Sequence, residues 1–243
     1  MLRLHRSNAA PRWKLILEGQ WLHLALLAPS VAGLAVAGTA EGMRAGTYEG
    51  IAAPAWYWIA ITLPIVHQVY VWFCWRTQLH GGLLTKVLGQ RAFPAYAIAF
   101  AIIGISRVAV VFPVAISNRD TLGADTAVLR ILAVSALVPW LYLVYSVGRY
   151  FGFRRATGQD HFDEAYRAKP FVRKGIFRFT RNGMYTCGFL IFWIPGLWYS
   201  SNAALLVAAF NHAYIWVHYF ATERPDMRQI YGDERVAARG AAG

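Results

Sequence analysis

The sequence predicts an all-α, polytopic membrane protein, a helical bundle of about six transmembrane helices with both termini on the cytoplasmic side. Of its 243 residues, 57% are hydrophobic and only 15% are charged, whereas soluble domains carry about 25% charged residues. Aromatic residues reach 15%, including 10 Trp and 13 Tyr, and these two types favour membrane–water interfaces. A bilayer can accommodate that much apolar surface, and a soluble core of this size cannot.

Six apolar segments supply the expected helices. A membrane-spanning helix needs about 20 mostly apolar residues, and six stretches come close to that length. They are Trp21–Ala37, Trp56–Trp75, Phe93–Ile116, Ile131–Val147, Met184–Trp198 and Ala203–Ala221. The fifth is the shortest and contains Pro195-Gly196, where we expect the helix to end or kink.

Basic residues divide unequally between the two ends of these spans. Cytoplasmic loops of membrane proteins carry an excess of Lys and Arg. The N-terminal segment, the second and fourth connections and the C-terminal tail together hold 20 of them, against three (Arg44, Arg119 and Arg130) on the other side. With an even number of spans, both termini are then cytoplasmic, in a bacterial inner membrane or the endoplasmic reticulum.

The net charge of +12 bears on the partners of the chain. No nucleic-acid-binding motif accompanies the charge, and the basic residues lie between apolar runs. Anionic lipid headgroups at the cytoplasmic face are therefore the expected partner, and nucleic acid is not. The sequence leaves open whether the chain forms a homo-oligomer.

The connection Gly148–Asn182 is longer than an ordinary link, which predicts structure and function of its own. We expect Asp160 to cap a short helix that runs to Lys169 and stops at Pro170. Aromatic residues interleaved with basic ones over 171–181 suit a segment at the headgroup level. A plain positively charged loop is the alternative.

Familiar cofactor and metal signatures are absent from the sequence. It has no strand pattern and no Gly-rich phosphate loop after a strand, so a Rossmann-type fold is not expected. Cys74 and Cys187 fall inside expected spans and have neither disulfide nor metal spacing. We therefore expect no metal site, and any cofactor must bind among the membrane helices or beside them.

Two polar stretches flank the last pair of spans. One runs from Arg181 to Tyr185 at the entry to the fifth span, and the other from Glu223 to Met227 at the exit of the sixth. A short connection near Tyr199–Asn202 makes these spans an antiparallel hairpin. Because entry and exit then lie at the same cytoplasmic level, Arg181, Asn182, Tyr185 and Glu223 are expected to converge.

Helical spacing places further polar and small side chains on the faces of this hairpin. In the sixth span, His212, Trp216, Tyr219 and Glu223 recur at spacings of four, three and four residues, which forms one stripe. In the fifth, Gly188 lies on the same face as Tyr185 and would allow close approach of a helix or ligand. Polar side chains this near the membrane usually face a cavity.

These motifs resemble the C-terminal signature of the phospholipid N-methyltransferases, which are grouped with the isoprenylcysteine carboxyl methyltransferases. The matching elements are Asn182-Gly183-Met184-Tyr185, then Glu223-Arg224-Pro225, then Tyr231-Gly232. The resemblance covers roughly Gly148 to Gly232. In this sequence, Gly183 stands where the family usually has Pro, and Arg224 stands where a second Glu is common.

The resemblance implies an S-adenosylmethionine-dependent methyltransferase whose acceptor is membrane-soluble, with a phospholipid amine headgroup as the first expectation. Prenylcysteine carboxylate and a small thiol come behind it. The chain then reads as one domain, 1–243. Its first four spans (1–147) would shape the acceptor side, and residues 148–243 would form the cofactor side.

The resemblance also implies roles for particular side chains. Arg181 would pair with the cofactor carboxylate, and Glu223 would hold its amino group or a ribose hydroxyl. Tyr185, Tyr219 or Trp216 would offer a π-face to the sulfonium. His212 or Glu223 would act as catalytic base. The remaining expected cofactor contacts are Asn182, Gly188, Gly148 and Gly152.

Each of these residues also has a purely structural interpretation. Arg181 could be a snorkelling arginine, Asn182 a helix cap, Tyr185 an interface tyrosine and His212 a packed histidine. Arg107, inside the third span, is costly there unless it is paired or in a wet cavity. No acidic residue lies within the spans to pair with it, so we expect it nearer the interface.

Three other functions remain open. The first is a membrane reductase that uses NADPH, because sterol reductases share a related C-terminal architecture. The second is a haem-binding protein with His67, His212 or His218 as axial ligand. The third is a membrane or transport protein without enzymatic activity.

Overall fold

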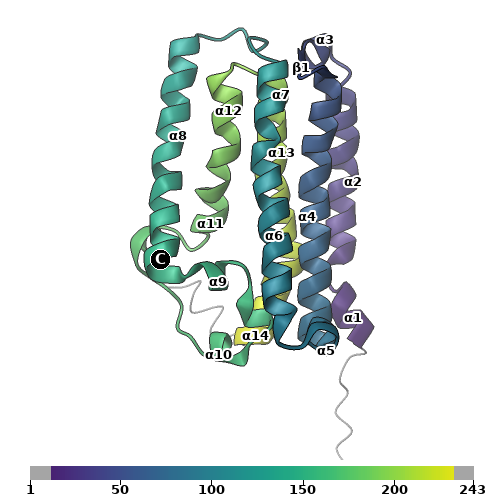
Figure 1. The fold of residues 1–243 in the computed structure, drawn as a ribbon, viewed down its shortest axis with the longest axis vertical. Coiled ribbons are helices and arrows are strands. Elements are labelled where there is room, and N and C mark those ends of the chain that lie inside the picture. The colour runs from purple at the N-terminus through teal and green to yellow at the C-terminus, as the bar shows by residue number, and fades with distance from the viewer. Residues whose placement is uncertain (1–11, 233–243) are drawn as a thin grey trace, which may run out of the picture.

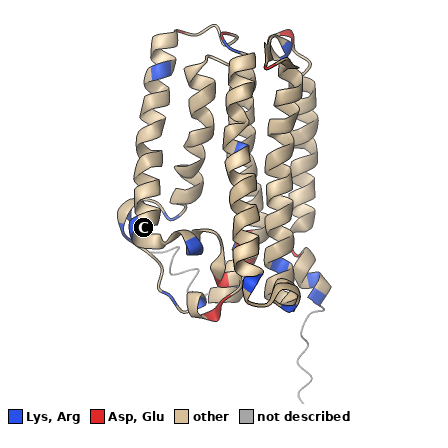
Figure 2. Ribbon diagram, viewed as in Figure 1, with Lys and Arg blue, Asp and Glu red and all other residues tan. Residues whose placement is uncertain are grey.

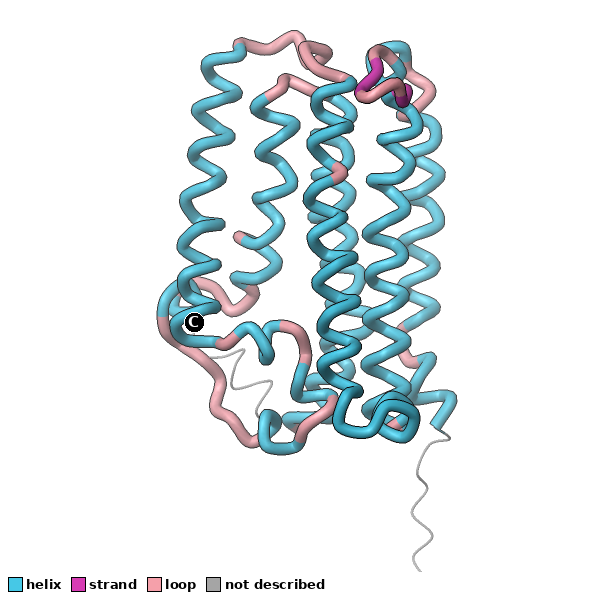
Figure 3. Tube along the Cα trace, in the orientation of Figure 1, coloured by secondary structure: helices cyan, strands magenta, loops and turns pink. Residues whose placement is uncertain are grey.

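Helices make up nearly all of the structure, a computed structural model that describes residues 12–232 (Figure 1). The helices are α1 (Arg12–Leu17), α2 (Gln20–Ala37), α3 (Glu41–Arg44), α4 (Ala53–Gly81), α5 (Leu83–Leu88), α6 (Ala92–Ala109), α7 (Val111–Ser117), α8 (Thr126–Ser146), α9 (Phe153–Ala156), α10 (Glu164–Arg167), α11 (Gly183–Thr186), α12 (Trp193–Trp198), α13 (Asn202–His218) and α14 (Arg224–Tyr231). Strands β1 (Thr47–Tyr48) and β2 (Ile51–Ala52) form a short antiparallel hairpin (Figure 3). The all-α prediction is confirmed, although no pattern in the sequence indicated this short hairpin.

Long apolar helices confirm the polytopic prediction. Five helical stretches within the described residues are long and apolar enough to cross a membrane: Arg12–Ala37, Ala53–Gly81, Leu83–Ser117, Thr126–Phe151 and Asn202–Tyr231. The shorter apolar stretch Gly183–Trp198 corresponds to the fifth expected span. Large apolar side chains such as Ile102, Ile105 and Val138 are exposed on the bundle surface, as expected for residues that face lipid.

The fifth segment is not a continuous α-helix. A 3₁₀ stretch, Gly188–Phe192, separates α11 from α12. Because a 3₁₀ helix rises about 2.0 Å per residue against 1.5 Å in an α-helix, the sixteen residues from Gly183 extend to roughly 26 Å, close to the hydrocarbon thickness. The irregularity was expected at Pro195-Gly196, but it precedes them. Pro195 lies in the first turn of α12, where proline is tolerated.

Helix α13 lies at the centre of the bundle and packs against α2, α4, α7 and α12. Its small residues Ala203, Ala204 and Ala208 are fully buried, which lets neighbouring helices approach closely. A Cβ on Gly196 of α12 would lie only 2.9 Å from the Leu205 backbone nitrogen, so glycine is required there. The expected α12–α13 hairpin is confirmed.

Side chains beyond the hairpin turn fix its register. The Asn118 Oδ1 accepts hydrogen bonds from the Ser201 hydroxyl (3.1 Å) and the Ala203 amide (3.0 Å). Ser201 is itself the N-cap of α13, and its hydroxyl accepts from the Ala204 amide. These bonds join the end of α7 to the start of α13.

Lys and Arg gather at one end of the bundle (Figure 2). This basic end holds α1, α5, α9 and α10 (Figure 1). The expected arginines Arg3, Arg6, Arg235 and Arg239 lie outside the described residues. The observed distribution has the form that the charge count predicts, with the basic end as the expected cytoplasmic end.

The long connection folds into short turns that pack beneath the bundle. It contains α9, a 3₁₀ turn at Gln159–His161, α10 and a second 3₁₀ turn at Gly175–Arg178. The expected helix from Asp160 to Lys169 is wrong, because α10 covers only Glu164–Arg167. Its cap is Asp163, whose Oδ1 accepts from the Ala165 amide at 2.9 Å. Asp160 is engaged elsewhere.

Candidate functional site

Two pockets lie against each other inside the basic half of the bundle. The outer pocket encloses about 550 Å³ of empty space, part of it open to solvent, and is lined by residues of the connection and α14 such as Arg155, Asp160, His161 and Tyr231. The inner pocket contains about 600 Å³ of empty space, part of it likewise open to the outside, between α4, α6, α13 and the fifth segment.

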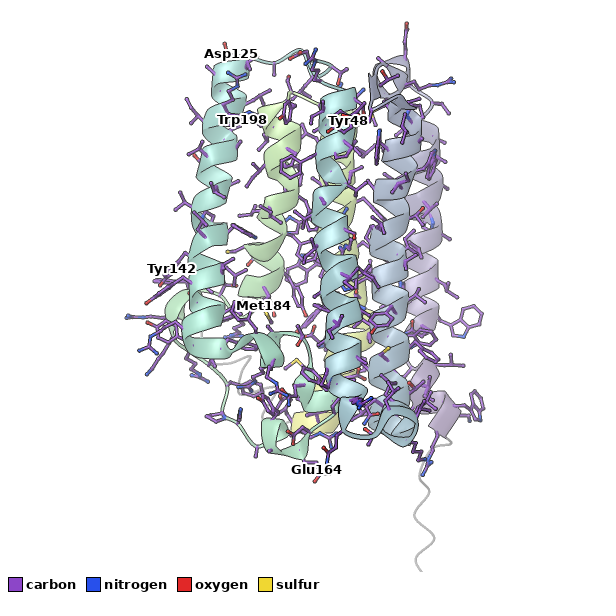
Figure 4. The ribbon with its side chains drawn as sticks, in the orientation of Figure 1. Tyr48, Asp125, Tyr142, Glu164, Met184 and Trp198 are labelled. Carbon is purple, nitrogen blue, oxygen red and sulfur yellow. The ribbon has the colours of Figure 1, made fainter. Side chains whose placement is uncertain are left out.

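Five residues line both pockets and mark their junction: Trp75, Ala156, Met184, Tyr185 and Glu223 (Met184 is labelled in Figure 4). Tyr185 and Glu223 come from the two polar stretches that the sequence singles out, at opposite ends of the hairpin sequence. The structure thus brings this pair to one place. The junction joins the outer pocket, whose lining includes several charged side chains, to a more apolar inner pocket.

Aromatic side chains surround Tyr185 at the junction. Its ring centroid lies 5.7 Å from that of Trp216 and 5.6 Å from that of Tyr219. Such edge and tilted contacts between aromatic rings are stabilising. Trp216 and Tyr219 therefore pack against the Tyr185 ring, but neither residue lines either pocket.

Arg181 and Asn182, expected to join this pair, are half-buried at the start of α11 but line neither pocket. Asn182 occupies the N-cap position without a side-chain cap bond. Its carbonyl accepts from the Tyr185 and Thr186 amides at 2.8 and 2.9 Å. Asn182 thus orients Tyr185 through the backbone.

The three expected cofactor glycines lie outside both pockets. A Cβ on Gly188 would lie 3.1 Å from Leu143 Cδ2, so this glycine allows close packing against α8. Gly152 has a φ of +89° and reverses the chain after the π-helical turn Val147–Phe151. Gly148 is exposed within that turn.

His212, the expected alternative base, faces the fifth segment. Its Nδ1 accepts a hydrogen bond from the Trp193 indole at 3.1 Å, and its ring lies 5.9 Å from that of Phe189. It lines neither pocket. The expected stripe therefore divides: Glu223, in the π-helical turn Tyr219–Glu223 that follows α13, lies at the pockets, and His212 is directed at α12.

A buried charge network under the outer pocket was missed by the sequence reasoning. The Arg76 Nε lies 2.6 Å from the Asp226 Oδ1, and both side chains are fully buried. The second carboxylate oxygen of Asp226 lies 3.2 Å from the His161 Nε2. Arg76 also donates to the Leu15 and Thr222 carbonyls. The network thus joins α1, α4, the connection and α14.

His161 is held between two carboxylates. Its Nδ1 lies 3.1 Å from the Asp160 Oδ1, opposite the contact with Asp226. Burial alone would lower the pKa of His161, but the contacts with Asp160 and Asp226 outweigh burial and raise it to about 9. Burial would likewise raise the pKa of Asp160, yet the hydrogen bond from His161 holds it below its usual value. His161 is therefore an imidazolium that donates to both acids at neutral pH.

Trp75 covers the imidazole and forms part of the pocket wall. The two rings stack with centroids 4.1 Å apart and planes at 19°. Gly158 makes this possible, because a Cβ there would lie 2.4 Å from the Trp75 ring and its φ is +83°. Tyr231 completes the arrangement by donating to the Asp160 Oδ2 at 2.6 Å.

Arg107 was expected near the interface, and the structure places it instead inside the bundle, 4% exposed. It donates to the His67 Nδ1 at 2.7 Å and to the Asn211 Oδ1 at 2.9 Å. Its guanidinium lies 5.6 and 5.5 Å from the Phe189 and Phe192 ring centroids. Neutral groups on three elements thus accommodate a cation that lacks an acidic partner in its own span.

Within residues 12–232, no group of three or more His, Cys, Asp and Glu side chains could hold a metal ion. Cys74 and Cys187 are both unpaired thiols.

Comparison with known proteins identifies the part of the chain that forms this hairpin. Residues 128–234 match the family model described as phospholipid methyltransferase, and this range runs from α8 through α14. No curated protein and no solved structure matches the chain. The resemblance noted over Gly148–Gly232 is confirmed as a similarity of residues 128–234 to the phospholipid methyltransferase family, in a chain whose helices are long and apolar enough to cross a membrane.

Proposed function

We propose that the protein transfers a methyl group from S-adenosylmethionine to a membrane-soluble acceptor, with a phospholipid amine headgroup as the first acceptor to test. The observation that carries the proposal is the junction at Tyr185 and Glu223, within the matched family domain. A water-soluble cofactor would enter the solvent-open outer pocket. A lipid-soluble acceptor would occupy the inner pocket, so that the two reactants meet at the junction.

The lining of the outer pocket suits the chemical groups of this cofactor. Glu223 supplies a carboxylate for an amino group or a ribose hydroxyl, and Arg155 supplies a cation for a carboxylate. Tyr185 and Trp75 supply π-faces, which attract a sulfonium as they attract other cations. Arg155 takes the place that the sequence assigned to Arg181, because Arg155 lines the pocket and is buried.

When bound, the cofactor supplies an electrophilic methyl group on a positively charged sulfur. The task of the protein is alignment, because a direct displacement depends on holding nucleophile, methyl carbon and leaving sulfur in line. Tyr185, braced by Trp216 and Tyr219, fixes one wall of the junction. An amine acceptor loses a proton as its nitrogen bonds to carbon, and the Glu223 carboxylate is positioned to take it.

The basic end of the bundle supports a membrane role for the surrounding surface. Lys and Arg gather around the solvent-open side (Figure 2), where anionic headgroups would attract them at about 1 kcal/mol each. In this proposal the surface keeps the outer pocket at the membrane–cytoplasm boundary, with the inner membrane of a bacterium or the endoplasmic reticulum as the setting.

Isothermal titration of the protein in lipid nanodiscs with S-adenosylhomocysteine tests the proposal. We expect saturable binding by the wild type and a roughly tenfold or greater loss in Glu223→Gln, the size of one charge-assisted hydrogen bond. His212→Gln is the matched control on the same helix and should bind as the wild type does. Absence of wild-type binding with the fold intact would contradict the proposal, and binding of NADPH instead would favour a reductase.

A further inference from the structure

The deep end of the inner pocket carries buried polar nitrogens for which residues 12–232 provide no hydrogen-bond partner. Arg107 and His67 both line this pocket and are 4% and 5% exposed. The Arg107 Nε and the His67 Nε2 are buried atoms without a hydrogen-bond partner among the described protein atoms. Unsatisfied buried polar atoms are uncommon in proteins, and each needs an explanation.

The hydrogen bond between these two residues fixes the role of the imidazole. A guanidinium can only donate, so the His67 Nδ1 must accept from Arg107 at 2.7 Å. In a neutral imidazole the proton then lies on the Nε2, which makes that unpartnered atom a donor. Arg107 and His67 therefore each present an N–H group that seeks an acceptor.

The positive charge of Arg107 also favours a ligand that accepts hydrogen bonds, and in particular an anion. Within the described residues no carboxylate lies in ion-pair distance of Arg107, whose polar partners are the neutral His67 and Asn211. A charged side chain inside a membrane bundle usually pairs or marks a ligand site. An oxyanion would neutralise the guanidinium and accept from the free N–H groups, and an amine would do neither.

The distance between Arg107 and the junction indicates how long a ligand that reaches both must be. Its partner Asn211 lies twelve residues before Glu223 on the same helical stretch, about 18 Å along the axis at 1.5 Å per residue. The pocket wall between these ends includes the apolar residues Val71, Ile215 and Phe189. The same wall also includes the buried polar residues Gln68 and His218. The pocket thus has an end at Arg107 that favours an anion and an end at the junction, with a largely apolar wall between them.

We propose that the inner pocket binds an amphiphile whose oxyanion, a carboxylate or a phosphate, is held by Arg107 and His67. That this amphiphile is the methyl acceptor rests on the function proposed above, and such an acceptor carries its oxyanion and its methyl-accepting group at opposite ends, unlike a phospholipid amine, whose phosphate lies two carbons from its nitrogen. The anion site itself rests on the pocket geometry alone. Substrate selection would then depend on the group that sits farthest from the transferred methyl.

Photolabelling in nanodiscs tests the proposal with three probes of equal chain length: diazirine-bearing hexadecanoic acid, hexadecyl phosphate and hexadecanol. We expect the acid, the phosphate or both to label the pocket segments around Phe100–Arg107 and Phe189, at least about tenfold more than hexadecanol, since a charge-assisted bond is worth a factor of this order. Whichever anion labels more strongly identifies the source of the oxyanion.

Arg107→Gln should reduce labelling by the anionic probes to the level of hexadecanol. Arg130→Gln is the matched control, because Arg130 also lies in a spanning helix and contacts an aromatic ring, that of Trp198, but lines neither pocket. Equal labelling by hexadecanol and the anions in the wild type would overturn the proposal, and this comparison needs no variant to fold.

S-adenosylhomocysteine binding, measured on the same nanodiscs, separates the two proposals. Anion-selective labelling without cofactor binding would remove the methyltransferase function and leave the anion site standing. Cofactor binding with no preference for the anionic probes would remove the anion site and leave the function standing.

Discussion

Replacing Asp226 with Asn removes one charge from the buried network beneath the outer pocket and keeps the side-chain shape. Asp226 is fully buried, with the Arg76 guanidinium at 2.6 Å on one oxygen and the His161 imidazole at 3.2 Å on the other. Arg76 is also fully buried, so water cannot replace the lost carboxylate. The substitution leaves a buried cation opposite a neutral amide.

The cost follows from what remains around Arg76. Breaking a buried ion pair by removing one partner costs about 3–5 kcal/mol, because the other charge stays desolvated. Among residues 12–232, the other acid within 4 Å of the guanidinium is Glu18, at 3.9 Å and 48% exposed, where screening by water weakens the attraction. We therefore expect Asp226→Asn to lower the free energy of unfolding by about 3–5 kcal/mol.

Equilibrium unfolding in mixed micelles, followed by tryptophan fluorescence, measures this loss. Glu18→Gln is the control, because an exposed ion pair contributes about 1 kcal/mol or less. A loss below about 1 kcal/mol for Asp226→Asn would refute the reasoning, since the network would then be solvated or absent. A double-mutant cycle with Arg76→Gln should give a coupling of the same order as the single loss.

Three further changes test the surroundings of the site. Because the pKa of His161 is raised to about 9, the contribution of its charge to stability is complete below about pH 6.5 and disappears as the pH rises through about 9. The free energy of unfolding of the wild type should fall by on the order of 3 kcal/mol over this range. The variant His161→Gln should show no such fall. Gly158→Ala should displace Trp75, destabilise the protein by at least about 1 kcal/mol and shift the tryptophan emission; an unchanged spectrum and stability would count against the stacking. His212→Gln should lose the Trp193 hydrogen bond, worth about 1 kcal/mol, with unchanged methyl transfer per folded molecule; a large activity loss at unchanged stability would return His212 to the catalytic machinery.

Hydropathy and charge counting were sufficient for the helical framework. The expected spans Trp21–Ala37 and Phe93–Ile116 correspond to α2 and α6–α7, because a run of apolar residues in a bilayer has few alternatives to a helix. The break in the fifth segment was misplaced. Proline and glycine mark weak points in a helix, but the 3₁₀ stretch depends on how the segment packs against α8 and α13, and a single sequence does not contain that information.

The site was partly predictable for a related reason. Tyr185 and Glu223 could be paired because the α12–α13 turn is short and local, so their meeting follows from helix geometry alone. The contact between Arg76 and Asp226 spans most of the chain, and Arg76 reads in the sequence as an ordinary positive-inside residue. Arg107 was noticed as costly, but its neutral partners His67 and Asn211 lie on two other helices and carry no charge pattern.

Methyl incorporation tests the central claim most directly. The protein in nanodiscs made of phosphatidylethanolamine and an anionic lipid would be incubated with S-adenosylmethionine that carries a radiolabelled methyl group, and the lipid extract would be counted. The account predicts label in the lipid fraction for the wild type and for His212→Gln, and a loss of about tenfold or more for Glu223→Gln. Wild-type protein that binds lipid and keeps its fold, but transfers no label to any of a panel of amine, carboxylate and thiol acceptors, would contradict it.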